Sequence, residues 1–216
     1  MKKPKSSHAS SPGRRADILR AALACFIENG VAGTSVSDIC AKAGVSVGSL
    51  YHHYRSMDGL AAALYLEGIR DYQNGMAGVL ARDVTAREGV RAIVRYHLGW
   101  VEQNRDWALF LFHERHAPFM GDTEEEFRKM NSVFIANMAA WIARHVESGK
   151  LRRMPPDLYA CVMLGPCQEF SRVFLSGNCM TPIGKAIMEI GESVWNAVSA
   201  AGNPAGALKK RKSSKK

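Results

Sequence analysis

Residues 34–54 read TSVSDICAKAGVSVGSLYHHY. Ser35 precedes an apolar-periodic run, and Asp38 follows it three residues later, which predicts a helix that begins with a capping box. Gly44 ends this helix, because glycine adopts the left-handed conformation at little steric cost. Ser46 caps a second short helix directly after the turn. The stretch therefore predicts two short helices that cross steeply, as in a helix-turn-helix.

The second of these helices carries hydrogen-bonding side chains and no carboxylate. A helix N-terminus adds a partial positive charge and free N–H groups, so nothing in this segment repels a phosphate. The second helix of a helix-turn-helix enters the major groove of DNA, whereas a surface helical hairpin with ordinary caps would show a similar pattern. We expect DNA contacts from Thr34, Ser35, Ser46, Val47, Ser49, Tyr51, His52 and Arg55.

Further short motifs surround this pair at fixed spacing. They are a first helix from Arg15 to Gly30, then Gly33-Thr34-Ser35-Val36, Asp38-Ile39, Ala43-Gly44-Val45-Ser46 and Gly48-Ser49-Leu50-Tyr51. Residues 14–66 thereby resemble the N-terminal domain of the TetR family of transcriptional regulators. The family often has a Lys that helps to hold the DNA backbone where this chain has Met57. The resemblance implies that this phosphate contact is either missing or made by Arg55.

The formal net charge of the 216-residue chain is +9, but the basic excess lies at its ends. Residues 1–15 hold five Lys or Arg residues, and residues 203–216 hold six. Residues 16–202 hold 18 basic and all 20 acidic residues, so their net charge is −2. We expect residues 1–13 and 203–216 to be disordered basic tails, which serve either solubility or phosphate attraction.

The apolar pattern is helical almost throughout, with no strand-like alternation. We predict an all-α fold of about nine helices, among them a long helix over residues 57–81. This order resembles the TetR architecture, which has an N-terminal three-helix helix-turn-helix domain and a C-terminal helical-bundle domain. The resemblance implies a DNA-binding domain in residues 14–56 and an effector-binding and dimerisation domain in residues 57–202.

Residues 93–141 are dense in aromatic and Met side chains. Such residues, with a few polar groups, line ligand pockets in helical bundles, and they also form ordinary bundle cores. The resemblance implies an effector cavity here, and we expect a small, partly apolar ligand. The predicted lining residues are Trp100, Trp107, Phe110, His113, Phe134, Asn137, Trp141 and Gln168.

The last two predicted helices, near residues 156–176 and 182–199, carry more apolar surface than one bundle layer can cover. The same surface of a second subunit is a suitable cover, which predicts a two-fold homodimer interface. The predicted interface residues are Phe170, Phe174, Ile187 and Val194.

The leading interpretation is a repressor that binds a double-stranded DNA operator and is released by a small-molecule effector. A redox- or metal-responsive regulator on the same scaffold is an alternative, using Cys161, Cys167 or the pair His113 and His116. A helical enzyme is a more remote one, since no Ser/His/Asp order, phosphate loop or paired catalytic carboxylates stand out.

The five cysteines are not spaced as a disulfide framework or a zinc site. We expect no metal, no cofactor and no enzymatic activity. The sequence has no apolar leader segment and no run of about 18 apolar residues, so we expect a cytoplasmic chain without a membrane span.

Overall fold

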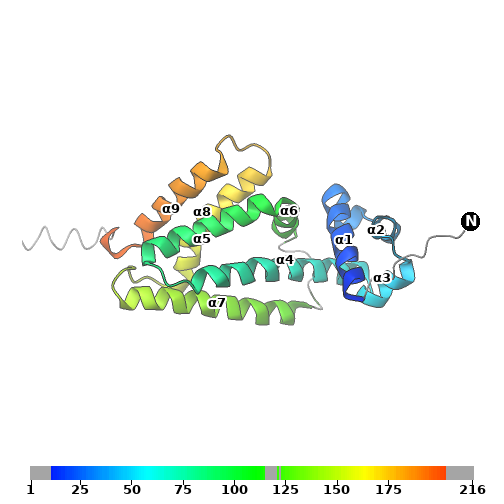
Figure 1. Cartoon of the computed structure of the whole chain (residues 1–216), viewed down its shortest axis with the longest axis horizontal. Coiled ribbons are helices and arrows are strands. Elements are labelled where there is room, and N and C mark those ends of the chain that lie inside the picture. Colours follow the sequence, from blue (N-terminus) through cyan, green and yellow to red (C-terminus); the bar gives the residue numbers. More distant parts are fainter. Residues whose placement is uncertain (1–10, 115–120, 122, 203–216) are drawn as a thin grey trace, which may run out of the picture. The chain divides into compact units, whose positions relative to one another are not determined.

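The computed structural model describes residues 11–114, 121 and 123–202 (Figure 1). Within these residues the chain is built from helices and one isolated β-bridge, between Leu151 and Ser199. The helices are α1 (Ser11–Gly33), α2 (Val36–Ala43), α3 (Val47–Tyr54), α4 (Met57–Leu80), α5 (Ala86–Gln103), α6 (Arg105–His113), α7 (Glu124–Glu147), α8 (Pro156–Leu175) and α9 (Ile183–Val198), followed by the short 3-10 helix η2 (Ala200–Gly202). The predicted all-α class is confirmed. Residues 1–10 and 203–216 of the predicted tails lie outside the described residues. Residues 11–13 belong to the start of α1, so the prediction of disorder is wrong for these three positions, where the helix begins earlier than the sequence pattern indicated.

The chain forms two compact units. The first consists of residues 1–69 and 106–127, and so contains α1 to α3, the first part of α4 and α6 from Asp106 onward. The second consists of residues 70–105 and 128–216, and so contains the rest of α4, all of α5, most of α7, and α8 and α9. The helix α4 is thus shared by both units. The functional division at residues 56 and 57 stays a prediction.

The core of the first unit forms between the apolar faces of α1 to α4. Ile18, Ile39, Leu50 and Leu60, one from each helix, have no exposed surface. Such burial stabilises the fold by roughly 1.5–3 kcal/mol for each large aliphatic side chain. These buried contacts hold the short helices α2 and α3, which would be too short to persist alone.

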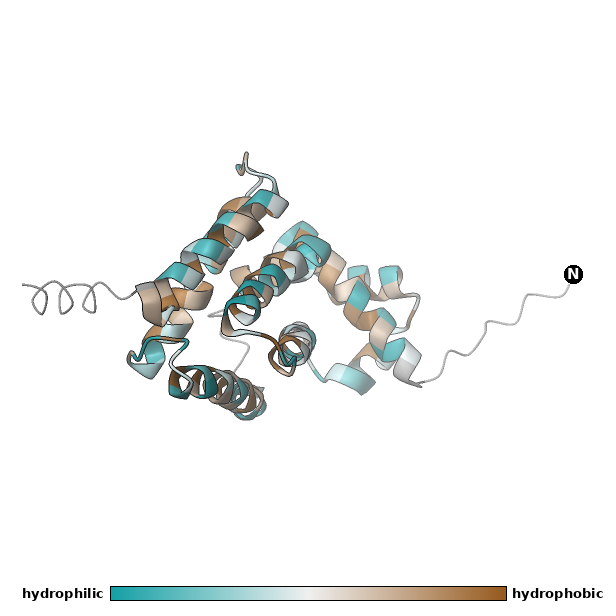
Figure 2. Cartoon of the chain, turned by 60° about the vertical axis from the view of Figure 1, so that its left-hand side comes forward, coloured by the Kyte–Doolittle hydropathy of each residue, from teal (hydrophilic) through white to brown (hydrophobic). Residues whose placement is uncertain are grey.

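The core of the second unit lies around α5. Val90, Val94 and Leu98 are spaced four residues apart on one face of that helix and are fully buried. Across the helices, hydrophobic and hydrophilic residues alternate, as expected for helices with one buried side (Figure 2). None of the helices in the described part of the chain combines the length and the apolar character of a membrane span.

The α5 and α7 helices approach closely at Gly89. A Cβ atom added to Gly89 would lie 2.4 Å from Cζ2 of Trp141, which is itself 4% exposed. Gly99, on the same helix, has no atom within 4 Å of the position its Cβ would take. The absence of a side chain at Gly89 is therefore a packing requirement, whereas at Gly99 it is not.

We predict that Gly89→Ala lowers the free energy of unfolding by about 1–3 kcal/mol, because Trp141 must move to admit the methyl group. The matched control Gly99→Ala should leave it unchanged or raise it by up to about 1 kcal/mol, because alanine favours the helix. Urea unfolding followed by circular dichroism measures both. Equal effects of the two substitutions would show that the α5–α7 contact is not tightly packed.

Candidate nucleic-acid interface and effector groove

The start of α2 has the predicted capping box. The Ser35 hydroxyl accepts a hydrogen bond from the backbone N–H of Asp38, and the backbone N–H of Ser35 donates to the Asp38 carboxylate at 3.1 Å. The Ser35 hydroxyl also donates to that carboxylate, at 2.6 Å. These side-chain and backbone hydrogen bonds from Ser35 lower the pKa of Asp38. The carboxylate is therefore engaged at the helix start, near the positive end of the helix dipole.

The turn between α2 and α3 depends on Gly44. Its backbone is left-handed, with φ 65° and ψ 34°, and the N–H of Val45 donates to the carbonyl of Cys40 at 3.1 Å. Ser46 then adopts an extended backbone, and its hydroxyl accepts from the N–H of Ser49 at 3.2 Å. These hydrogen bonds satisfy a backbone carbonyl at the end of α2 and a backbone N–H at the start of α3.

The α3 helix has one buried and one exposed face. Leu50 and Tyr54 are 0% and 5% exposed, and they anchor the helix in the core of the first unit. Val47 and Tyr51 are 48% and 44% exposed, although both are large apolar or aromatic side chains. The exposed side chains of α3 and its flanks are predicted DNA contacts, namely Ser46, Val47, Tyr51, His52 and Arg55, while Ser49 is half-buried.

The two remaining predicted contacts precede α2. Ser35 is exposed, but its hydroxyl takes part in the cap. Thr34 is only 8% exposed, and its hydroxyl lies 2.7 Å from the carbonyl oxygen of Gly30 and 3.1 Å from that of Cys25. The Thr34 side chain therefore holds the end of α1, and the DNA contacts proposed below omit it.

A hollow of about 380 Å³ lies beside the end of α3, and basic residues line it. Its lining includes Arg15, His53 and Arg55. The Arg15 guanidinium lies 5.9 Å from the centre of the Tyr54 ring, and the Tyr54 hydroxyl donates to the Arg15 carbonyl at 3.3 Å. Arg15 thus adds a second guanidinium to this hollow, a contribution that the sequence pattern did not reveal.

The start of α4, next to this hollow, is capped by Ser56. Its hydroxyl accepts from the N–H of Gly59 at 2.9 Å. A Cβ atom on Gly59 would lie 2.8 Å from the carbonyl oxygen of Tyr54, so a longer residue there would push the two helix ends apart. The absence of a side chain at Gly59 therefore allows a close approach of α3 and α4.

The predicted effector residues divide between the two units. Trp107, Phe110 and His113 belong to the first unit, where Phe110 is 2% exposed and stacks on Phe26 with ring centroids 5.8 Å apart. Trp107 packs against Gly68, and His113 is exposed at the end of α6. The other predicted residues, Trp100, Phe134, Asn137, Trp141 and Gln168, belong to the second unit.

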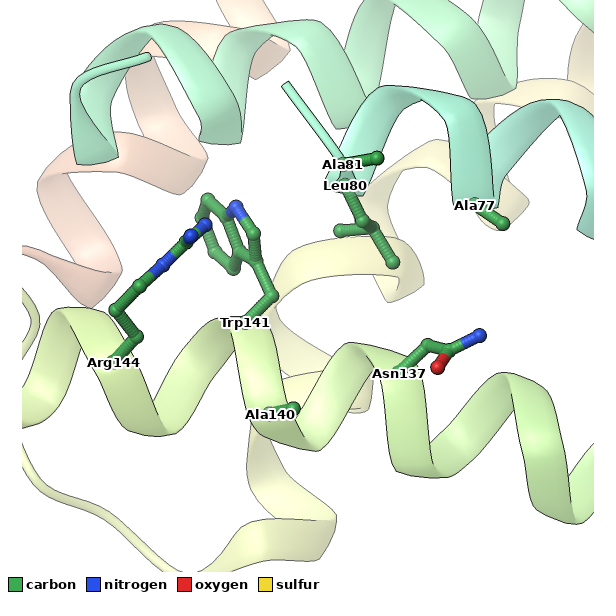
Figure 3. Close-up of a pocket in the computed structure, with 7 residues that line it drawn as sticks. All are labelled: Ala77, Leu80, Ala81, Asn137, Ala140, Trp141 and Arg144. Carbon is green, nitrogen blue, oxygen red and sulfur yellow. The ribbon is translucent and has the colours of Figure 1, made fainter. Parts of the chain in front are cut away.

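Within the second unit, a groove of about 460 Å³ lies between α4 and α7. Two of the predicted residues, Asn137 and Trp141, line it, together with Ala77, Leu80, Ala81, Ala140 and Arg144. In Figure 3 the side chains of Trp141 and Arg144 project from α7 toward α4, and Leu80 projects from α4. The groove therefore combines an apolar middle with one amide and one guanidinium.

The other three predicted residues of this unit lie outside the groove. The Trp100 indole N–H donates to the Asp71 carboxylate at 2.8 Å, and the Phe134 ring lies 6.4 Å from that of Tyr72. Gln168 is exposed on α8.

Two candidate functional residues are absent from the predicted effector site. Arg144 follows Trp141 by three residues and Asn137 by seven, a helical spacing that could have revealed it. The second is Tyr72, whose hydroxyl lies 2.8 Å from Nδ1 of the buried His97. A pairing over 25 residues has no local sequence signal.

The predicted dimer surface is partly apolar and partly buried. Phe170 and Phe174 are half-buried on α8 and stack with ring centroids 6.2 Å apart, and Ile187 on α9 is half-buried. Met188, next to it, is 67% exposed. Val194 is only 1% exposed and packs in the core of its own chain, so the interface proposed below omits it.

Two residues of the redox and metal alternative, Cys161 and Cys167, lie on α8 in the second unit, and His113 lies in the first unit. Burial raises the pKa of the Cys167 thiol to about 12, so it is protonated at neutral pH and a poor nucleophile. Cys161 is exposed on the same helix, and His116 lies outside the described residues. No group of three or more His, Cys, Asp or Glu residues suited to a metal ion occurs within the described ranges.

Curated relatives resemble parts of the chain. The HTH-type transcriptional repressor KstR2 of Rhodococcus jostii strain RHA1 is 30% identical over 91 residues, which cover 42% of this chain and 45% of the relative. The HTH-type transcriptional repressor DhaR of Mycobacterium sp. strain GP1 is 25% identical over 146 residues, which cover 66% of this chain and 73% of the relative. The chain thus matches less than half the length of the first of these relatives.

Solved structures share the fold. A TetR family transcription regulator from Marinobacter aquaeolei VT8 superimposes with a TM-score of 0.74 at 21% identity, over 87% of this chain and 96% of that one. The transcriptional regulator FadR from Bacillus subtilis, in complex with stearoyl-CoA, gives a TM-score of 0.73 at 16% identity, over 87% and 98%.

Family models cover most of the sequence. The model for bacterial regulatory proteins of the tetR family matches residues 18–64, which include the α2–α3 pair. The model for the tetracyclin repressor-like C-terminal domain matches residues 65–200. The chain therefore belongs to the TetR family of bacterial regulatory proteins.

Proposed function

We propose that this protein is a transcriptional repressor that binds an operator as a homodimer and leaves it when a small ligand binds the second unit. The observation that carries the proposal is the exposed face of α3, which presents Ser46, Val47 and Tyr51 and no carboxylate. This face is held rigidly by Leu50 and Tyr54 on the opposite side. A helix that is anchored on one face and exposes side chains without carboxylates on the other is suited to major-groove recognition.

Selection of bound DNA tests this function. Purified full-length protein is incubated with fragments of its own genome, and the retained fragments are sequenced. A discrete site with two-fold sequence symmetry is expected, because each subunit of a symmetric dimer reads one half-site. Uniform retention of all fragments at moderate salt would leave only non-specific phosphate attraction and would reject the proposal.

The DNA contacts divide into two roles. Tyr51, His52 and Arg55 lie toward the end of α3 and contact the phosphate backbone, whereas Ser46, Val47 and Ser49 at its start lie nearest the bases. The basic hollow of Arg15, His53 and Arg55 compensates for the lysine that the family often has at the position of Met57. Two guanidiniums suit a phosphate, since each offers several N–H donors.

The dimer forms through α8 and α9, where Phe170, Phe174 and Ile187 are half-buried in the isolated chain. Met188, which follows Ile187, is 67% exposed and extends this apolar surface, and Leu158 near the start of α8 is 44% exposed. Such a surface around a two-fold axis is complementary to itself.

The effector occupies the groove between α4 and α7. Its apolar part contacts Leu80 and Trp141, and a polar or acidic group meets Asn137 and Arg144. A relative in fold, FadR, was solved with stearoyl-CoA, which supports a largely apolar ligand in this class of domain. Tenfold release of DNA requires a preference of only about 1.4 kcal/mol for the non-binding conformation.

No enzymatic step is part of this function, which is regulation by binding alone. We place the protein in the cytoplasm, since its partner is chromosomal DNA. Repression rather than activation is supported by the names of the repressors KstR2 and DhaR.

Tyr51→Phe removes a hydroxyl that we assign to the phosphate backbone. We predict that binding weakens up to about tenfold on the selected operator and on random DNA alike, because a phosphate contact carries no sequence information. Val47→Ala is the matched control on the same exposed face, and should change sequence preference instead. Fluorescence anisotropy with both DNAs measures the affinities. A change in preference alone for Tyr51→Phe would reverse the assignment.

Ile187→Glu and Phe174→Glu place a charge in the proposed dimer surface. Both should yield monomers, since an unpaired charge is costly to bury. Val133→Glu is the control, because Val133 is 61% exposed on α7, away from α8 and α9 in sequence. Sedimentation velocity gives the masses. Dimers in all three variants would exclude this interface.

Ala140→Trp fills the groove, while Ala136→Trp, one turn earlier on α7, alters an exposed alanine that does not line it. The anionic, apolar dye 1-anilinonaphthalene-8-sulfonate serves as a probe. We predict that Ala140→Trp lowers its binding at least tenfold and that Ala136→Trp binds it as the unsubstituted protein does. Binding that is equal in both variants would place the dye elsewhere and remove the groove as the effector site.

A further inference from the structure

A buried polar pair lies among aromatic side chains of the second unit. His97 of α5 is 6% exposed, and its Nδ1 lies 2.8 Å from the hydroxyl of Tyr72 on α4. The two rings meet edge to face, with centroids 5.6 Å apart. The pair is not part of the α2–α3 interface or of the lining of the α4–α7 groove.

The pair fixes where the proton of His97 lies. Burial lowers the pKa of His97 to about 4, so its ring is neutral and carries one N–H at physiological pH. Burial also raises the pKa of Tyr72, so its hydroxyl keeps its hydrogen. The phenol is the stronger acid of the two neutral groups and donates to Nδ1, which puts the imidazole proton on Nε2.

This Nε2–H points to no acceptor. The Nε2 atom is buried and has no hydrogen-bond partner among the described residues. Two polar side chains whose rings contact Tyr72 have partners: the Tyr96 hydroxyl donates to the Tyr72 carbonyl at 2.9 Å, and the Trp100 indole N–H donates to Asp71 at 2.8 Å. A buried donor without a partner is costly, and in a native protein it calls for an explanation such as an absent ligand.

Aromatic rings surround Tyr72, and both Tyr72 and Phe134 lie close in sequence to residues of the effector groove. The Tyr72 ring contacts those of Tyr96, Trp100 and Phe134, with centroids 5.4–6.4 Å away. Tyr72 precedes the groove residue Ala77 by five positions on α4, and Phe134 precedes Asn137 by three on α7. Tyr72 and a groove residue therefore lie less than two turns apart on α4, and Phe134 and a groove residue lie within one turn on α7.

We propose that the Nε2–H of His97 donates a hydrogen bond to an uncharged oxygen, a carbonyl or a hydroxyl, at the buried end of the effector. This assignment rests on the proposed function and names the chemical class of its ligand. Tyr72 is a positioning residue, which holds His97 in the donating tautomer. The rings of Tyr96, Trp100 and Phe134 contact the apolar carbons next to the oxygen.

An uncharged oxygen fits this place better than a carboxylate. One neutral N–H is the open donor of the pair, and no Lys or Arg takes part in the ring contacts of Tyr72. A buried carboxylate needs several donors or a cation to replace its hydration. A carboxylate on the same ligand would have to lie toward Arg144, at the groove.

Three probes of similar size isolate this oxygen: 4-phenyl-2-butanone, 4-phenylbutanoate and butylbenzene. Their binding to the full-length protein is measured by calorimetry or by quenching of tryptophan emission. The ketone should bind at least tenfold more tightly than butylbenzene and than the carboxylate. His97→Leu, of similar volume, should abolish this preference while butylbenzene binds as before. Equal affinity of ketone and hydrocarbon, no binding of any probe, or an unchanged preference in His97→Leu would overturn the assignment.

The tautomer supplies a second measurement that does not depend on folding of the leucine variant. Long-range ¹H–¹⁵N spectra of ¹⁵N-histidine-labelled protein should show His97 protonated at Nε2 at neutral pH, and the added ketone should shift that nitrogen. Tyr72→Phe should remove the tautomer preference and weaken the ketone about tenfold. Protonation at Nδ1, or a signal insensitive to the ketone because a bound water alone fills the place, would reject the proposal.

Retention of the selected DNA by each variant is recorded in parallel. If the unsubstituted protein retained no specific DNA, the proposed function itself would be rejected. Specific retention without the ketone preference would reject only the role of His97.

Discussion

The left-handed turn at Gly44 is the constraint on which the α2–α3 pair depends. With φ 65° the backbone reverses between two helices that are each eight residues long. No atom lies within 4 Å of the position a Cβ would take, so the restriction comes from the backbone conformation and not from space. The caps at Ser35 and Ser46 satisfy the helix ends on either side. Leu50 then fixes the rotation of α3, which decides the side chains it exposes.

The proposed function requires that ligand binding in the second unit affect the first, and α4 contributes residues to both units. This helix runs from Met57, next to the basic hollow, to Leu80 in the groove, and it carries Tyr72 between them. A ligand that favours another position of α4 would also move the helix end beside Arg55. The ligand changes DNA affinity only by as much as it prefers that other conformation.

Features set by nearby residues could be predicted from the sequence. The capping box of Ser35 and Asp38, the glycine turn and the helical class all follow from signals within a few positions, and the structure shows them. The density of aromatic residues over positions 93–141 is also typical of an ordinary bundle core, and Trp100 and Trp141 are both buried.

Features set by tertiary partners could not be predicted. Periodicity does not say which helix covers a face, so Phe110 was grouped with Trp141 although they belong to different units. The burial of Thr34 depends on the carbonyl of Cys25, nine residues away. Val194 looked like an interface residue because its cover, the core around α5, is contributed by distant sequence. The Tyr72–His97 pair joins two helices that carry no shared motif.

The central claim is that two copies of the chain place their α3 helices in successive major grooves of one operator. Phosphate-ethylation interference on the selected DNA tests it most directly, because it locates each backbone contact to a nucleotide. The account predicts two symmetric groups of interfering phosphates, with centres about 10–10.5 base pairs apart or a multiple of that distance. One group alone, or two groups on opposite faces of the duplex, would contradict it.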